Sequence, residues 1–209
     1  MFSLEAMFGR KDKTLALLQA SADAACDAAH AATQLVGDGD ADRFMATLMD
    51  ARQRSKALAR QISTALIETF VTSLEREDIE AMNAALYVIP KTTERFAERY
   101  RLVVTRLGDL DFGARTDILA RSAEVVAAMV RELRSGLRVA PMRTLQTQLQ
   151  ALEAEGDRLL LAPYRDFYLS ARDPMRALLA KDLFETVEQA INQCRDAGNI
   201  IYTTVLKNS

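Results

Sequence analysis

Two pairs of polar side chains, each spaced four residues apart, offer this chain its clearest metal-binding chemistry. Glu153 and Asp157 form one pair, and Glu188 and Asn192 form the other. Because residues i and i+4 share one face of a helix, each pair presents its oxygen atoms to one side. Oxygen atoms from two neighbouring helices suit a hard cation, so we expect one divalent or iron cation (Mg²⁺, Mn²⁺, Fe or Zn²⁺) at these four residues.

The corresponding positions in the first half of the chain have the opposite character. A constant step of 101 residues takes the four positions back to Arg52, Lys56, Tyr87 and Lys91. Cationic side chains repel a metal ion, so we expect no metal site there. Arg52, Lys56 and Lys91 could instead form an anion pocket, with phosphate as the ligand.

Each set of residues also has a simpler interpretation. The acids could be a solvated helix face that forms salt bridges with Arg158 and Arg195. The cations could pair with acids such as Glu94 or Glu98, or they could face solvent. Residue types leave both alternatives open.

Few side chains in the sequence are suited to catalysis. His30 is the single histidine, and one histidine cannot build a histidine-based metal site, so we expect a structural or surface residue. Cys26 and Cys194 match no metal or redox spacing and lie on apolar stripes, which favours buried, reduced thiols. No nucleophile with an attendant base and no glycine-rich phosphate loop can be found, so we expect no enzyme.

Composition narrows the class of protein further. The 209 residues are 49% hydrophobic and 27% charged, with eight glycines and four prolines, which favours an all-α fold with a full core. A net charge of −2, with acids and bases interspersed, gives no reason to expect nucleic-acid binding.

The sequence contains no apolar run of about 18 residues, so we expect no transmembrane segment and a cytoplasmic protein. Its first thirteen residues are apolar and then basic, the reverse of a signal peptide. This segment could dock on a membrane surface, cap the helices or pack in a dimer, so a position peripheral to the inner membrane is an alternative.

Apolar periodicity predicts six long helices. The first two are expected over about residues 11–36 and 42–70. The third begins in the acidic segment 72–78 and ends at 107, and the fourth begins at 114 and ends within 136–141. The last two are expected over about residues 142–169 and 173–206. The third has the most regular stripe, with apolar or small residues at alternating spacings of three and four. The glycine-bounded segment 108–113 divides the chain into residues 1–108 and 114–209, which we expect to be two three-helix repeats. Long apolar stripes also allow a homodimer.

Several segments resemble one known family. Residues 68–79, Glu-Thr-Phe-Val-Thr-Ser-Leu-Glu-Arg-Glu-Asp-Ile, are similar to a run in PhoU-like phosphate-transport regulators. Residues 152–158, Leu-Glu-Ala-Glu-Gly-Asp-Arg, resemble a second box of that family, and the opening residues and the last helix, from Asp182 to Asn208, also agree. The nearest resemblance is to the branch often encoded beside Pit-type phosphate transporters.

This resemblance implies a tandem pair of three-helix bundles without catalysis, with metal sites built from acid pairs four residues apart. It implies a cytoplasmic regulator or accessory protein of inorganic phosphate transport that contacts a phosphate transporter or a phosphate-sensing membrane protein. The second half keeps Glu153, Asp157 and Glu188 and has Asn192 in place of an acid, whereas cations replace the acids of the first half. A metal-binding helical bundle, and a structural scaffold that has lost its metal sites, remain the alternatives.

Overall fold

The computed structural model describes residues 4–37, 40–68, 74–170 and 173–209, and the side chains of residues 13–37, 40–68, 74–159 and 173–209. These residues form six α-helices and no strand, which confirms the predicted all-α fold. The helices are α1 (Leu4–Val36), α2 (Ala41–Glu68), α3 (Arg76–Leu107), α4 (Gly113–Ser135), α5 (Val139–Ser170) and α6 (Pro174–Asn208).

Local side-chain chemistry explains where several helices begin and end. Asp173 caps α6, because its carboxylate accepts a hydrogen bond from the backbone N–H of Arg176 at 3.0 Å, and Pro174 occupies the first turn. Asp40 accepts a bond from the backbone N–H of Arg43 in the same way at the start of α2. Gly108 follows α3 with a φ of +65°, a conformation in which glycine is unstrained.

Two predicted boundaries were wrong. The first helix begins at Leu4, about two turns before the expected residue 11. The fifth begins at Val139 instead of residue 142, since a proline in the first turn, Pro141, removes no intrahelical hydrogen bond. The expected end of the second helix at residue 70 lies outside the described residues, as do the side chains of the apolar and basic opening segment.

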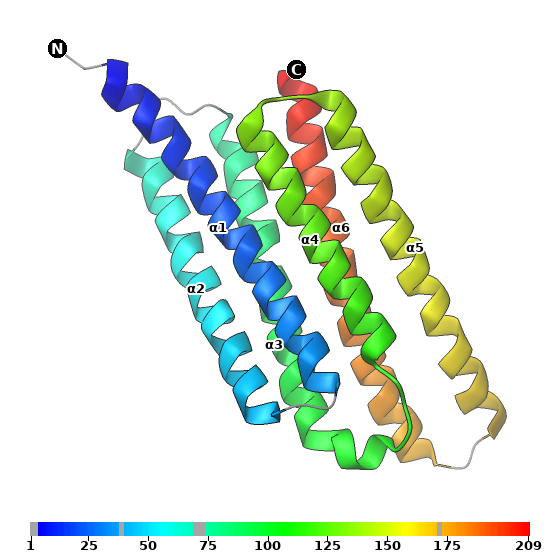
Figure 1. Ribbon diagram of the computed structural model, residues 1–209. Helices are drawn as coiled ribbons and strands as arrows, with labels where there is room; N and C mark the ends of the chain where they lie inside the picture. Colours follow the sequence, from blue (N-terminus) through cyan, green and yellow to red (C-terminus); the bar gives the residue numbers. More distant parts are fainter. Residues whose placement is uncertain (1–3, 38–39, 69–73, 171–172) are drawn as a thin grey trace.

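The helices are arranged as two groups of three that share long interfaces. Helices α1, α2 and α3 all contact one another, and so do α4, α5 and α6. The two groups meet where α1 packs against α4 and α3 packs against α6, and helices that follow one another in the chain run in opposite directions (Figure 1). The face between α5 and α6 and the face between α2 and α3 therefore lie in different groups.

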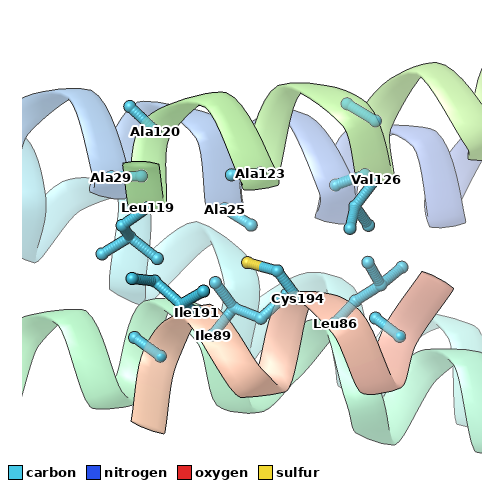
Figure 2. Close-up of a cluster of buried hydrophobic side chains, with 14 of the residues drawn as sticks. Ala25, Ala29, Leu86, Ile89, Leu119, Ala120, Ala123, Val126, Ile191 and Cys194 are labelled. Carbon is cyan, nitrogen blue, oxygen red and sulfur yellow. The ribbon is translucent and has the colours of Figure 1, made fainter. Parts of the chain in front are cut away.

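Small residues allow the two groups to approach closely along α1 and α4. Ala25 and Ala29 on α1 face Ala120 and Ala123 on α4, and all four are buried (Figure 2). Leu119, on α4, continues the same core toward α3 and α6. Because alanine side chains take little space, this interface positions the two groups without large gaps.

An aromatic cluster joins the groups near the junction between α3 and α4. The rings of Phe112 and Phe184 stack with centroids 4.6 Å apart, and Phe96 and Tyr100 pack against Phe112. The guanidinium of Arg115 lies 4.0 Å from the centroid of the Phe184 ring. The stripe predicted for the third helix is confirmed, because its members from Ile79 to Phe96 are buried.

Candidate functional sites on two helix faces

The first of the four residues expected to bind a metal is already neutralised by a cation. Glu153 on α5 forms an ion pair with Arg195 on α6, whose Nη1 donates a hydrogen bond to Oε1. Arg195 also donates a hydrogen bond to Asp196 at 3.0 Å. The bond to Asp196 has the larger effect and the bond to Glu153 the smaller, and both raise the pKa of the Arg195 guanidinium. The simpler interpretation of Glu153 as part of a salt bridge with Arg195 is therefore confirmed.

The remaining acids of this face lie close enough to interact unfavourably. Burial of Glu188 raises the pKa of its carboxyl, and the negative charges of Asp157 and Glu185 raise it further. Asp157 on α5 is exposed, and Asn192 on α6 is half-buried. Glu188 and Asp157 thus form a small site of negative charge between α5 and α6.

Within the part of the chain that the structure describes, no three His, Cys, Asp or Glu side chains gather closely enough to hold a metal ion. A cation here would bind the carboxylates of Asp157 and Glu188 and the amide oxygen of Asn192. This set carries fewer negative charges than a site built from four acids. The expected cation at Glu153, Asp157, Glu188 and Asn192 stays a prediction.

The cations predicted for the first half converge on one tyrosine between α2 and α3. Arg52 donates a hydrogen bond from Nη2 to the hydroxyl of Tyr87 at 2.8 Å, and its guanidinium carbon lies 4.4 Å from the centroid of that ring. Its Nε lies 3.3 Å from Oε2 of Glu94, as the simpler interpretation predicted. The Arg52 side chain is only 13% exposed, so these contacts hold it in one position.

Lys56 and Lys91 lie beside the same tyrosine. The pKa of the Tyr87 hydroxyl is lowered, first by its hydrogen bond with Arg52 and then by the charges of Arg52, Lys91 and Lys56. Both lysines are exposed, and neither forms an ion pair with any residue that the structure describes. Arg52, Lys56 and Lys91 are therefore brought together, as the spacing predicted.

A groove of about 670 Å³ runs from this tyrosine along the α2–α3 face. Asn83, which is 3% exposed, anchors its floor by donating hydrogen bonds to the carbonyl of Ala59 at 3.2 Å and to the hydroxyl of Ser63 at 3.4 Å. Ser63 in turn donates to Glu80. The lining residues are Lys56, Ala59, Arg60, Ser63, Thr64, Glu80, Asn83, Ala84 and Tyr87.

Sequence reasoning missed five polar residues of this groove, namely Arg60, Ser63, Thr64, Glu80 and Asn83. A signal was present, because Arg60 lies one helical turn beyond Lys56 and Asn83 one turn before Tyr87. Extending the two stripes of spacing four by one step would have found both residues.

The other titratable groups singled out by the sequence lie away from both faces. Burial raises the pKa of the Cys26 thiol to about 12 and raises that of the fully buried Cys194 as well, so both are protonated. His30 is exposed and lies 3.0 Å from Glu124, which confirms the prediction of a surface residue. Among the described residues, no helix is both long and apolar enough to span a membrane.

Comparison with known proteins identifies the fold. No family model matches the sequence. The UPF0111 protein YkaA of Bacillus subtilis (strain 168) is 20% identical over 144 residues, which are 69% of this chain and 70% of that protein. The crystal structure of a PhoU-like protein from Shewanella oneidensis MR-1 matches with a TM-score of 0.79 and 17% identity, over 92% of this chain and 99% of that one. The chain has a PhoU-like fold.

A second PhoU-like structure supports the same conclusion. It is that of a candidate PhoU-like phosphate regulatory protein, also from Shewanella oneidensis MR-1, with a TM-score of 0.77, 17% identity and coverage of 93% and 96% of the two chains. The predicted PhoU-like architecture is therefore confirmed over nearly the whole chain. The resemblance to the branch found beside Pit-type transporters stays a prediction.

Proposed function

We propose that this PhoU-like chain is a non-enzymatic, cytoplasmic regulator or accessory protein of inorganic phosphate transport that acts by protein–protein contact. The observation that carries the proposal is the match of this fold to a protein described as a candidate PhoU-like phosphate regulatory protein, over 93% of this chain. Fold likeness is an argument by analogy, so the site chemistry must be consistent with it.

The described side chains support a role without catalysis. The two thiols are protonated because burial raises the pKa of each one. The imidazole of His30 lies 3.0 Å from the carboxylate of Glu124 at the surface. A protein of this kind regulates by binding two states of its partner with different affinity.

The partner contact that we propose involves exposed leucines where α3 and α6 pack together. Leu102 and Leu178 are 81% and 61% exposed. Arg99 and Asp182 form an ion pair at 2.8 Å, and each leucine lies one turn from it toward the same end of the bundle. Burying apolar side chains of this size against another protein surface releases favourable free energy. A transporter or a phosphate-sensing membrane protein would supply that surface.

Phosphate uptake in the source organism tests this function. We expect deletion of the gene to change the rate of labelled phosphate uptake, and the wild-type chain to restore it. The double variant Leu102→Glu, Leu178→Glu should fold but fail to restore the rate, because charge opposes burial. Ile67→Glu, Leu206→Glu is the matched control, since it changes two exposed apolar residues elsewhere. Unchanged uptake after deletion would refute the proposed function.

A second candidate function is cation binding between α5 and α6. It is favoured by the proximity of Asp157 to Glu188, because a nearby cation would relieve the repulsion between the two carboxylates. Elemental analysis of protein purified without an affinity metal or chelator would test it. One equivalent of metal that is lost in Glu153→Ala, Asp157→Ala supports the cation, and no metal in either protein leaves a scaffold that has lost its metal sites.

A further inference from the structure

The Tyr87 region concentrates positive charge in a chain whose net charge is −2. Arg52, Lys56 and Arg60 lie one turn apart along α2, and Lys91 lies across from them on α3. Two acids lie near these cations: Glu94 pairs with Arg52, and Glu80 accepts a hydrogen bond from Ser63 at the far end of the groove. Lys56, Arg60 and Lys91 remain without an ion-pair partner among the residues that the structure describes.

Hydrogen-bond donors in this region outnumber their acceptors. The Nη1 atom of Arg52 is buried and finds no partner among the described residues. Tyr87 accepts a bond from Arg52 and keeps its own O–H as a donor. Each lysine ammonium adds three further donors. A ligand that carries several acceptor oxygens would satisfy donors from both helices at once.

Arg52 is also held in place before any ligand arrives. Glu94 fixes its Nε, and Tyr87 fixes its Nη2 and covers one face of the guanidinium. A fixed guanidinium loses little conformational freedom on binding, and its Nη1 atom is the donor that a phosphate oxygen would satisfy. The two exposed lysines supply mobile charge beside it.

We propose that Arg52, Lys56 and Lys91, with the hydroxyl of Tyr87, form a binding site for a phosphate group at the end of the α2–α3 groove. A doubly charged group with several oxygens fits three cations and two uncommitted donors better than a singly charged ion does. The phosphate group belongs either to free inorganic phosphate or to a lipid headgroup. This site is independent of the proposed transport function, because binding can be measured with the purified chain alone.

Calorimetric titration and thermal unfolding of the full chain test the site. Inorganic phosphate is added up to about 10 mM at constant ionic strength, with chloride as the balancing anion, since a ligand of the folded state raises the melting temperature. The test variant is Lys56→Gln, Lys91→Gln, which removes two exposed side chains and leaves the more buried Arg52 intact. Lys13→Gln, Lys181→Gln is the control, because it makes the same change of charge at exposed lysines on α1 and α6.

We expect phosphate to bind the wild type and the control equally and the test variant about tenfold more weakly. A second arm uses phosphatidylcholine vesicles with and without phosphatidic acid. Vesicle binding that needs the two lysines and is reversed by inorganic phosphate assigns the headgroup, and binding of inorganic phosphate alone assigns the free ion. Equal loss in test and control variants, or no binding in either arm, would overturn the site.

Discussion

Arg52 on α2 donates a hydrogen bond to the hydroxyl of Tyr87 on α3 at 2.8 Å, with its guanidinium 4.4 Å from the centre of the same ring. The corresponding positions of the second half, Glu153 and Glu188, carry acids instead. Glu153 there is neutralised by Arg195 from the neighbouring helix. The α2–α3 face and the α5–α6 face therefore correspond to each other at an offset of 101 residues. Positive charge is left uncompensated on the first face and negative charge on the second.

The Arg52–Tyr87 contact predicts an unusual titration. The hydrogen bond and the nearby cations stabilise the tyrosinate, so the pKa of Tyr87 lies below its ordinary value. Replacing Arg52→Gln removes the largest of these effects and should raise the pKa toward that ordinary value. Titration of tyrosine ring carbons by NMR would measure it, with Tyr87→Phe to assign the signal. A pKa that stays low in Arg52→Gln would contradict the contact.

Glu188 predicts a substitution that stabilises the protein. Burial and the charge of Asp157 raise the pKa of Glu188 in the folded state, so ionisation at neutral pH opposes folding. In metal-free buffer, Glu188→Gln should increase the free energy of unfolding at pH 7 by about 0.5 kcal/mol. Urea denaturation would measure this difference.

The pH dependence fixes the sign of this effect. The folded pKa is raised, so the favourable contribution of the protonated carboxyl is complete below the unfolded pKa and disappears as the pH rises through the folded value. The gain from Glu188→Gln should therefore vanish in acid. If added Mg²⁺ or Mn²⁺ stabilised the wild type more than this variant, the cation between α5 and α6 would be supported instead.

The alanine interface between α1 and α4 predicts sensitivity to added volume. Ala123 is fully buried and faces Ala25 and Ala29 (Figure 2). Ala123→Leu should cost about 1–3 kcal/mol of folding free energy, because the two helices must separate to make room. The exposed Ala57 on α2 is the control, where the same substitution should change stability by less than about 0.5 kcal/mol. A tolerated leucine at position 123 would show that the two groups of helices pack more loosely there.

Helix type and extent were predictable because apolar spacing and capping residues act locally. The stripe from Ile79 to Phe96 and the Asp173 cap both follow from neighbours within a few turns. The convergence of Arg52, Lys56 and Lys91 also followed from spacing. The pairing of Glu153 with Arg195 remained one of two alternatives, because its outcome depends on how α5 and α6 are rotated against each other. The position of Asn83 followed from its spacing of four before Tyr87, but its hydrogen bonds to Ala59 and Ser63 depend on how α2 and α3 are rotated against each other.

The Asp173 cap of α6 predicts that stability falls only when the substituted side chain cannot accept a hydrogen bond. Asp173 accepts the backbone N–H of Arg176 at 3.0 Å, and this bond satisfies one of the donors left free at the start of α6. Asp173→Ala should reduce the free energy of unfolding by about 1 kcal/mol, whereas Asp173→Asn should retain most of it because asparagine caps equally well. Thermal and urea unfolding of both variants would check this. Equal destabilisation by alanine and asparagine would indicate that the carboxylate acts through its charge, since asparagine keeps the hydrogen bond and loses only the charge.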